Sequence, residues 1–377
     1  MLWIAWRILV GDTAKYLGMI IGVAFASLLI AQQASIFCGL MRLTVSQILD
    51  VEGAAIWVMD PDVQFVDDIK PLSENELLRV RGVEGVRWAV RFFKGLGRAR
   101  LAEGEYQQVV LLGLDDATLV GAPQTILLGS LDDLRQPDAV MMDRRGFERL
   151  WPGEPLSVGK TFEMNDRRAV IVGVCESRRT FQTFPVVYTR YSQATMFAPH
   201  ERKLLSFILV QNEPNVDADA LCRRITQQTG LQALTRNGFI WKTIFYYLRQ
   251  TGIPVNFGIT VLLGFIVGVA IAGQTFYLFA VENARQYATL KALGLSDARV
   301  VVMILQQAVV VGLIGYSIGV GGAAIFGLLI QNRSKLAFFM PWQVLLGTGI
   351  AVLVIVLAVS VLSVRRVIVM EPAEVFK

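Results

Sequence analysis

Four long apolar stretches divide the chain into membrane-type and globular parts. They cover residues 17–40, 254–280, 301–330 and 342–364, whereas residues 41–253 mix apolar and polar positions as a folded domain does. Each stretch exceeds the roughly 20 helical residues that cross the hydrocarbon core of a bilayer. The pattern predicts an α-helical membrane protein with four transmembrane helices and a large extracytoplasmic α+β domain after the first.

The segment before the first apolar stretch has its own pattern. Residues 1–16 place bulky apolar side chains and two basic residues, Arg7 and Lys15, at near-helical spacing, and Trp3 and Trp6 suit a membrane interface. We expect an interfacial helix on the inner face of the membrane; the alternative is an early start of the first span. Ala24-Phe25-Ala26 has the composition of a signal-peptide cleavage site, but the apolar run continues beyond it, which favours an uncleaved span.

Basic residues near the span ends predict the orientation. They gather before the first span, between the second and third, and after the fourth, as Arg7, Lys15, Arg285, Lys291, Arg299, Arg365, Arg366 and Lys377. The loop between the third and fourth spans carries only Arg333 and Lys335. Because basic residues near span ends favour the cytoplasm, both termini and the 281–300 loop are expected inside and the large domain outside.

Residues 41–253 carry both helix and strand signals. Ser73 and Glu76 form a Ser-x-x-Glu capping box before an apolar run, and Asp217 can cap a second helix that Gly230 ends. Apolar, β-branched runs predict strands at residues 54–59, 86–93, 108–114 and 206–211. This order indicates an α+β domain with an inserted, mostly-β subdomain and a stalk helix at 241–250.

The stretch WPGEPLSVGKTF, residues 151–162, ends in Gly-Lys-Thr as a nucleotide-binding P-loop does. A P-loop requires glycine where Glu154 stands, and a helix after the threonine. Here Asn165-Asp166 is a turn signal followed by a β-branched run, which predicts a β-hairpin over residues 160–174. Lys160 is therefore expected on the hairpin surface, and we expect no ATP site in this stretch.

Catalytic and metal-binding patterns do not emerge from the remaining residues. The only histidine is His200, and no Ser, Cys or zinc motif accompanies it. Three acidic pairs, Asp67-Asp68, Asp115-Asp116 and Asp132-Asp133, are expected in solvated turns, without metal-ligand spacing. Cys175 and Cys222 are expected as buried thiols, a disulfide between them being the alternative. The net charge of +5 is scattered, so a nucleic-acid surface is not expected.

The loop between the second and third apolar stretches carries the sharpest functional signal. Residues 282–293 have helix-forming composition, Gly294 stops the helix, and Ser296 can cap the next one. Such a helix–turn–helix is rigid enough to pass movement between a soluble partner and two spans; the alternative is a plain connector. The residues expected to carry this coupling to a soluble partner are Glu282, Arg285, Tyr287, Ala288, Lys291, Leu293 and Gly294.

This loop resembles the signature of the FtsX/MacB-like family of ABC transporter permeases, the type VII ABC systems. The tail with Glu371-Pro372-Ala373, the hairpin VGKTFEMNDRRAVIVGV and the order of one span, a large outer domain and three spans are also similar to that family. WKTIFYYLRQTGIPVNFG, which leads into the second span, and IWVMDPD resemble the DevC branch most. The resemblance covers essentially the whole chain.

The resemblance implies a non-catalytic membrane subunit of an exporter. The loop at 281–300, with the seven coupling residues given above, would dock on a separate ABC ATPase. ATP and magnesium would bind that ATPase, so no cofactor is expected on this chain. Two copies would form a homodimer in the bacterial inner membrane and work with a periplasmic adaptor and a TolC-like outer-membrane channel to expel a lipid or hydrophobic compound. The alternatives are a lipoprotein-releasing permease of the LolC/LolE type and an FtsX-like transducer that controls a cell-wall hydrolase.

Small residues in the third span predict close packing of helices. Gly315 and Gly319 form a small-xxx-small pair, and Gly312 precedes them by one turn. We expect this face to pack against neighbouring spans or the partner protomer. The organisation expected along the chain is an interfacial helix at 1–16, spans at 17–40, 254–280, 301–330 and 342–364, a periplasmic domain with its stalk at 41–253, a coupling loop at 281–300, a short periplasmic loop at 331–341 and a cytoplasmic tail at 365–377.

Overall fold

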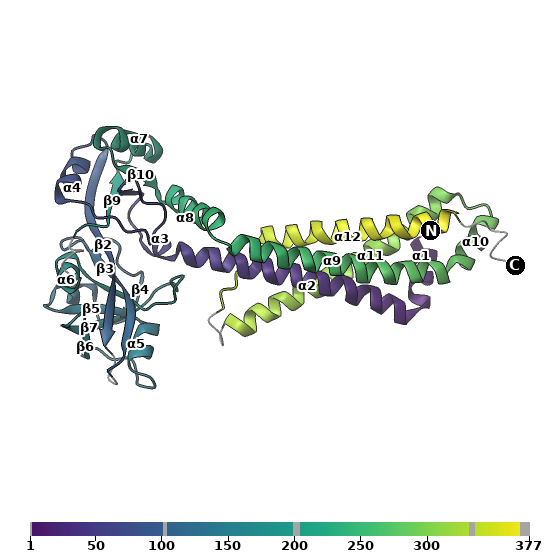
Figure 1. Cartoon of the computed structure of the whole chain (residues 1–377), viewed down its shortest axis with the longest axis horizontal. Helices are drawn as coiled ribbons and strands as arrows, with labels where there is room; N and C mark the ends of the chain where they lie inside the picture. Colours follow the sequence, from purple (N-terminus) through teal and green to yellow (C-terminus); the bar gives the residue numbers. More distant parts are fainter. Residues whose placement is uncertain (1, 101–103, 199–203, 332–335, 370–377) are drawn as a thin grey trace. The chain divides into compact units, whose positions relative to one another are not determined.

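A computed structural model describes residues 2–100, 104–198, 204–331 and 336–369. The described residues separate into two compact units, one built from Met1–Leu40 together with Gly252–Lys377 and the other from Met41–Thr251. The first holds long apolar helices and the second a mixed sheet with helices (Figure 1). His200, Arg333, Lys335 and the tail from residue 370, which includes Glu371-Pro372-Ala373, lie outside the described residues.

The membrane-type unit is entirely helical where it is described. Its helices are α1 (Leu2–Gly11), α2 (Thr13–Thr44), α9 (Ile253–Glu282), α10 (Ala284–Ala292), α11 (Asp297–Gln331) and α12 (Trp342–Val369). Among the described residues, four of them, α2, α9, α11 and α12, are long and apolar enough to cross a membrane. Helices α9 and α11 both pack against α12. The predicted set of four apolar helices is therefore confirmed.

The N-terminal segment differs from the expected single interfacial helix at 1–16. Helix α1 ends at Gly11, and Asp12 caps the start of α2, because its carboxylate accepts a hydrogen bond from the Lys15 amide at 3.3 Å. Residues 13–16 therefore belong to the first long helix. Helix α1 packs against α11, and Leu9 is buried in the core that the long helices share. Protein contacts thus hold this helix on one face.

The second unit contains a sheet in which the described residues form ten strands. They are β1 (Ile56–Met59), β2 (Val86–Arg100), β3 (Tyr106–Leu114), β4 (Thr125–Leu128), β5 (Ala139–Asp143), β6 (Thr161–Met164), β7 (Arg167–Glu176), β8 (Val186–Arg190), β9 (Phe207–Asn212) and β10 (Gln232–Thr235). The order is β10-β1-β9-β2-β3-β8-β5-β7-β4, and β6 pairs with β2 and β7. Only β3–β8 and β5–β7 are parallel among these pairs. The predicted α+β class is confirmed.

Strand β2 belongs to both halves of this sheet. Its first half pairs antiparallel with β9, with Val90 opposite Leu209, and its second half pairs with β3, with Leu96 opposite Val110. At the change of partner, the Ser206 hydroxyl accepts from the Lys94 amide and donates to the Lys94 carbonyl, each at 2.9 Å. The expectation that this strand ends at residue 93 is wrong, because Gly95 and Gly97 weaken the strand pattern without ending the strand.

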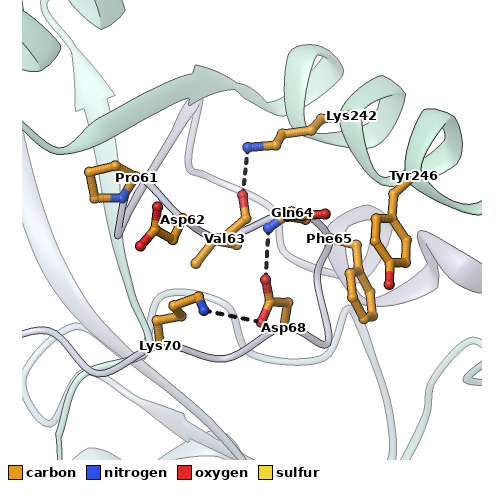
Figure 2. Close-up of a pocket in the computed structure, with 9 residues that line it drawn as sticks. All are labelled: Pro61, Asp62, Val63, Gln64, Phe65, Asp68, Lys70, Lys242 and Tyr246. Atoms are coloured by element: carbon orange, nitrogen blue, oxygen red, sulfur yellow. Dashed lines mark hydrogen bonds and ion pairs between the residues drawn. The ribbon is translucent and has the colours of Figure 1, made fainter. Parts of the chain in front are cut away.

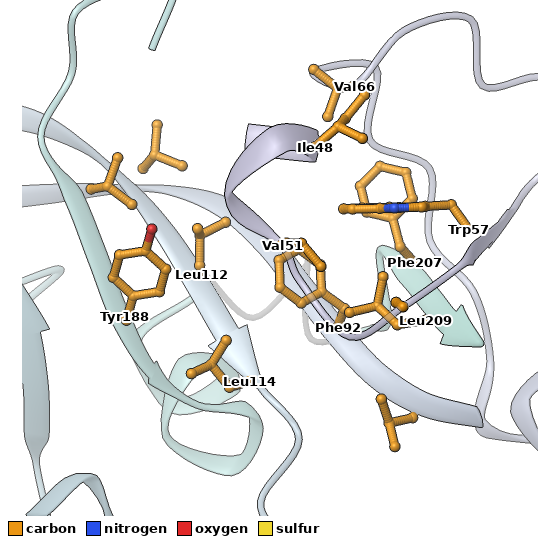
Figure 3. Close-up of a cluster of buried hydrophobic side chains, with 14 of the residues drawn as sticks. Ile48, Val51, Trp57, Val66, Phe92, Leu112, Leu114, Tyr188, Phe207 and Leu209 are labelled. Carbon is orange, nitrogen blue, oxygen red and sulfur yellow. The ribbon is translucent and has the colours of Figure 1, made fainter. Parts of the chain in front are cut away.

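Alternation along the central strands builds a core on each face of the sheet. In β1, Ile56 and Val58 face a core shared with α4 (Glu74–Arg81) and α7 (Ala218–Thr229). Trp57 points the other way, edge-on to Phe92 and Phe207, with ring centroids 5.6 and 5.3 Å away (Figure 3). That second core continues into the β3–β8 half through Leu112 and Tyr188. Both faces of β1 are buried, which explains its unbroken apolar sequence.

Several local predictions are confirmed. Ser73 and Glu76 form the predicted capping box of α4, and the Asp217 carboxylate accepts the Ala220 amide hydrogen bond at 2.9 Å at the start of α7. The predicted hairpin is β6–β7, with Asn165 and Asp166 at φ 48° and 62° in its turn. Short helices complete the unit: α3 (Ser46–Asp50), η1 (Leu131–Arg135), α5 (Arg144–Leu150) and α6 (Tyr191–Phe197).

Two segments that lead towards the membrane helices are bound together within this unit. Helix α3 follows α2, and α8 (Arg236–Gln250) precedes α9 in the chain. The Arg236 guanidinium donates to the carbonyls of Leu49 at 2.7 Å and Ile48 at 3.2 Å. Arg178 adds an ion pair with Asp50 at 2.6 Å. The entrance and exit of the domain therefore share one hydrogen-bonded base.

Candidate functional site

The candidate site is the joint where α9 gives way to α10 and α11. Asn283 ends α9: its amide N–H and its side-chain Nδ2 both donate to the Phe279 carbonyl, at 3.0 and 2.9 Å. A side chain that competes with the backbone for hydrogen bonds favours a helix break. Glu282 therefore belongs to the end of α9, and the expectation of one helix from 282 to 293 is corrected to α10 at Ala284–Ala292.

Helix α10 has one buried and one exposed face. Ala284, Tyr287 and Ala288 are at most 7% exposed and lie at the i, i+3, i+4 spacing of one helical face. The opposite face exposes Arg285, Gln286, Thr289, Ala292 and Leu293. Leu293 is 79% exposed, which is unusual for a leucine next to a packed core. The exposed face is therefore the part of this helix that another molecule can reach.

A buried hydrogen bond attaches α10 to α11. The Tyr287 hydroxyl donates to Gln307 Oε1 at 3.0 Å, and the two residues are 1% and 2% exposed. Burial raises the pKa of Tyr287 to about 12, so its hydroxyl keeps the proton at neutral pH. Apolar contacts with Val300, Met303 and Ile304 surround the ring. Helix α10 is thus fixed to α11 by packing and by one specific polar contact.

Backbone hydrogen bonds and one ion pair hold the turn that follows α10. The Leu295 amide donates to the Leu290 carbonyl at 3.1 Å and the Gly294 amide to the Lys291 carbonyl at 2.9 Å, which is a Schellman motif. Gly294 has φ +94°, a conformation that disfavours any side chain. The Lys291 ammonium forms an ion pair with Asp297 at 2.7 Å, across the turn. The two helices therefore meet in a defined geometry.

The bend between α1 and α2, at Gly11-Asp12, lies beside the same joint and is called the elbow below. Lys15 forms ion pairs with Asp12, at 2.7 Å, and with Glu282. Between the elbow and α10 lies a hollow of about 590 Å³, lined by Arg7, Ile8, Gly11, Asp12, Thr13, Ala14, Glu282, Asn283 and Gln286. The exposed face of α10 and this hollow form one continuous feature through Gln286. A partner docking on α10 would therefore also reach the elbow.

The sequence of these elements matches two known domain families. Residues 16–228 match the MacB-like periplasmic core domain, more than half of the chain, and residues 258–372 match the FtsX-like permease C-terminal domain. This chain belongs to the FtsX/MacB-like family of ABC transporter permeases. The second match includes α10 and its exposed face. The family and the four apolar helices make it an inner-membrane protein with a periplasmic domain.

Relatives of this FtsX/MacB-like permease are named ABC transporter permeases. Rv0072 of Mycobacterium tuberculosis (strain ATCC 25618 / H37Rv) is 26% identical over 221 residues, and Mb2592 of Mycobacterium bovis is 30% identical over 222 residues. Each alignment covers 58% of this chain and 58% of the relative, so the chain spans little more than half of their length. These names come from the relatives and assign no substrate to this permease.

Two solved periplasmic regions are similar to the permease's domain. The periplasmic region of MacB from Actinobacillus actinomycetemcomitans is 15% identical, with a TM-score of 0.40, and covers 54% of this chain and 96% of that one. The extracellular domain of YknZ from Gram-positive bacteria is 17% identical, with a TM-score of 0.36, covering 48% and 98%. The family assignment rests on the two domain matches and not on these likenesses.

The residues predicted to couple the permease to an ATPase divide into four groups. Arg285 and Leu293 are exposed on α10, whereas Tyr287 and Ala288 are buried and hold the helix in place. Lys291 and Gly294 shape the turn, and Glu282 bonds to the elbow. The sequence reasoning missed Gln286, Thr289, Asn283 and Gln307. The 3.6-residue period around Tyr287 was the signal that separates the exposed positions from the buried ones.

The glycines of α11 lie where other helices pass closely. A Cβ on Gly315 would lie 2.7 Å from the side chain of Val23, and one on Gly319 would overlap the Ala24 carbonyl of α2. Gly312 faces α12 instead, 2.7 Å from Val356. The Ser27 hydroxyl also donates to the Tyr316 carbonyl at 3.3 Å. This face of α11 thus packs against helices of the same chain, as small residues in membrane helices permit.

Other chemistry-bearing residues of the permease have structural partners. Lys160 lies beside Trp151, 5.1 Å from its ring, and pairs with Glu154 at the hairpin, so the Gly-Lys-Thr stretch is not a P-loop. Cys175 and Cys222 are buried free thiols, as expected. Among the described residues, no group of His, Cys, Asp and Glu could hold a metal ion.

Two of the acidic pairs are not simply solvated. Asp67 pairs with the buried Lys94 ammonium, and Asp115 is 5% exposed and accepts hydrogen bonds from Thr118. The expectation of a solvated position is therefore wrong for Asp115, whereas Asp67 lies in a turn with its side chain 28% exposed. Asp132 and Asp133 do occupy an exposed turn, the start of η1. The sequence RFFKGLG does not indicate that Lys94 is buried, because Asp67, which pairs with it, lies in a distant loop.

Proposed function

We propose that this chain is the permease subunit of a DevC/MacB-like ABC exporter. In this proposal it passes ATP-driven motion from a cytoplasmic ABC ATPase to the periplasm and so drives tripartite efflux of a lipid or hydrophobic compound. The observation that carries the proposal is the exposed face of α10, held on a rigid joint between two apolar helices. The family matches support an ABC system, and the relatives' names agree with it.

Docking on α10 gives a direct route for motion. Tyr287 and the Schellman turn fix α10 to α11, so a displaced α10 moves α11 with it. Asn283 alone separates α10 from α9, so the displacement also acts on the end of α9. Helix α9 spans Ile253–Glu282, about 45 Å at 1.5 Å per residue, and follows α8 after Gln250. Because Arg236 ties α8 to α3, motion that reaches α8 also acts on the segment that follows α2. Helices α3 and α8 would then move together.

The proposed assembly places α10 and both termini in the cytoplasm. The basic residues Arg285, Lys291 and Arg299 around α10 support this orientation. Magnesium and ATP would bind the ATPase chain, and two copies of the permease would form a homodimer. A periplasmic adaptor and a TolC-like outer-membrane channel would complete the exporter.

The test is to isolate the full chain with its partners and then to perturb only the exposed face. The tagged chain is extracted in mild detergent with trapped nucleotide, and co-purifying proteins are identified by mass spectrometry. We expect an ABC ATPase and an adaptor. Arg285→Glu should reduce ATPase recovery at least fivefold, whereas Arg168→Glu, an equal charge reversal on exposed β7, should not.

Each alternative has its own outcome. An ATPase with a cell-wall hydrolase and no adaptor would replace efflux by mechanical signalling. An ATPase with lipoproteins as the only cargo would favour a lipoprotein-releasing permease. Recovery of no ATPase from either the parent chain or the Arg168→Glu variant would refute the coupling role of α10.

A further inference from the structure

Residues 336–341, with the sequence LAFFMP, lead into α12 and form neither a helix nor a strand. They belong to the membrane-type unit, where backbone outside a helix must find its hydrogen-bond partners within the protein. We call this segment the strap. It contacts α2 on one side and α11 on the other, at the end of α2 that leads into the periplasmic domain.

The backbone of the strap lies directly against α2. The Phe339 amide donates to the Ser35 carbonyl at 3.0 Å. One turn later in α2, a Cβ on Gly39 would lie 2.7 Å from the Ala337 carbonyl carbon and 2.8 Å from the Phe338 nitrogen, closer than packed atoms allow. Glycine is the residue that permits such an approach of two backbones. Position 39 therefore determines whether the strap can lie on α2.

A side chain of the strap lies against α11. The Phe338 ring covers Gly327, where a Cβ would overlap the ring, and it meets Phe326 edge-on with centroids 6.4 Å apart. Phe338 is half-buried, whereas Phe339 is 39% exposed. The absence of a side chain at Gly327 provides the place for this ring. The strap thus bridges the two helices, with its backbone on α2 and one ring on α11.

Helix α11 also touches α2 further from the domain, where Gly319 passes the Ala24 carbonyl. Gly39 follows Ala24 by 15 residues, which is about 22 Å along a helix. One contact of this kind lets a helix tilt about it, whereas two contacts this far apart also fix its direction. The strap therefore controls whether the domain-side end of α2 follows α11.

We propose that the strap carries displacement of α11 into the end of α2 that leads to the periplasmic domain. Phe338 and Gly39 are its positioning residues. The inference rests on the proposed function and deepens it, because it names a route for the motion that runs from α10 through α11 to α2, in addition to the route through α9 and α8.

Helix α8 reports the other route. It follows α9 in the chain and is held by the domain: the Lys242 ammonium donates to the Val63 carbonyl at 2.5 Å, and the ring of Phe65 stacks on Tyr246 with centroids 4.2 Å apart. Figure 2 shows both side chains of α8 directed at the 60–70 loop. A change that reaches α8 through α9 does not pass through the strap, so α8 is an internal reference.

The test uses the full chain with its co-purified ATPase in lipid nanodiscs. Hydrogen exchange of backbone amides is measured with and without ATP trapped by vanadate. In the parent chain, we expect trapping to change exchange in α10, in residues 36–44 of α2 and in α8. The size of each change is then compared between the parent and the variants.

Two variants remove the strap from its place by different means. Gly39→Ala adds a Cβ against the strap backbone while favouring the helix of α2, and Phe338→Ser removes the ring from Gly327. Without nucleotide, the Phe339 amide should exchange at least tenfold faster in both. With nucleotide, the response of residues 36–44 should fall to less than half, and that of α8 should remain. Gly321→Ala, with no heavy atom within 4 Å of its Cβ, is the matched control and should respond as the parent does.

An unchanged response of residues 36–44 in both variants would overturn the inference. So would an equal loss in α2 and α8, because the strap would then support the fold and not the route. A parent chain that responds in α10 but not in residues 36–44 would refute the strap alone. A parent chain with bound ATPase and no response in α10 would refute the proposed function itself, so the two failures are distinguished.

Discussion

The Tyr287 hydroxyl lies 3.0 Å from Gln307 Oε1 and joins α10 to α11 at a point closed to solvent. A buried acceptor that loses its donor costs more than the bond contributes, so this pair strongly favours one arrangement of the two helices. The Lys291–Asp297 ion pair, at 2.7 Å, is a second contact between the same two helices. Removing one atom, the Tyr287 hydroxyl oxygen, would therefore loosen the attachment of α10 to α11.

Tyr287→Phe removes that atom while keeping the ring in its apolar surroundings. We expect a loss of about 1–3 kcal/mol of stability, because Gln307 Oε1 loses this donor in a buried place. The melting temperature of the purified chain in detergent should fall, and ATPase stimulation should fall with it. Tyr277→Phe, 42% exposed on α9, is the control and should change neither value. Equal effects of both substitutions would argue against a special role for the Tyr287 bond.

Ala288→Pro tests whether α10 must be a continuous helix. Proline in a helix interior removes a hydrogen bond and clashes with the preceding turn, at a cost of about 3 kcal/mol. Because α10 is short and separate from the long helices, we expect the chain to stay folded but to lose ATP-driven transport. Circular dichroism and a transport assay in vesicles measure the two quantities. Normal transport in this variant would contradict the assignment of α10 as the coupling helix.

Gly319→Leu tests the contact between α11 and α2. The added side chain would overlap the Ala24 carbonyl, and overpacking of this kind costs about 1–3 kcal/mol or more. Gly321→Leu is the matched control on the same helix, because no heavy atom lies within 4 Å of its built Cβ. We expect a lower melting temperature only for Gly319→Leu. A similar loss in both variants would mean that helix composition, and not this contact, determines stability.

Asp143 makes the domain's stability depend on pH. Burial raises its pKa to about 6, against hydrogen bonds from the Val186 and Gly146 amides and the nearby Arg145, while Glu176 raises it further. A raised pKa in the folded state gives stability that is complete below about pH 4 and is lost as pH rises through 6. The loss is on the order of 2–3 kcal/mol.

Asp143→Asn keeps an oxygen for both amides and carries no charge. Hydrogen-exchange protection of α5 and β8 in the full chain, corrected for intrinsic rates, should match the parent chain near pH 4. It should exceed the parent near pH 7.5. If protection in the parent chain does not fall between these values, the buried carboxyl has little influence on stability.

The membrane topology and the domain's class could be predicted from the sequence because both depend on patterns that are local. Apolar runs define the spans, and the Ser73 and Asp217 caps need only neighbouring residues. The Gly294 turn was predictable for the same reason. These features do not depend on contacts with distant parts of the chain.

Features that depend on distant contacts could not be predicted in this way. Lys94 is satisfied by Val66 and Asp67, more than 25 residues earlier in the chain, so its burial left no local pattern. The extension of β2 to Arg100 depends on pairing with β3, which overrides the weak strand preference of its glycines. Within α10, the spacing of Ala284, Tyr287 and Ala288 indicates one buried face, but the bond from Tyr287 to Gln307 could not be predicted, because Gln307 lies on another helix.

The strand that serves both halves of the sheet has a consequence for engineering. Because β2 changes partners in its middle, the β3–β8 region is not a module that can be excised between two loops. Removing it would leave the second half of β2 as an unpaired edge carrying Leu96 and Phe93. Such an edge invites pairing between molecules and aggregation. Chimeras that exchange this region between related permeases should therefore be joined before Val86 and after Asn212, so that β2 and β9 are transferred together.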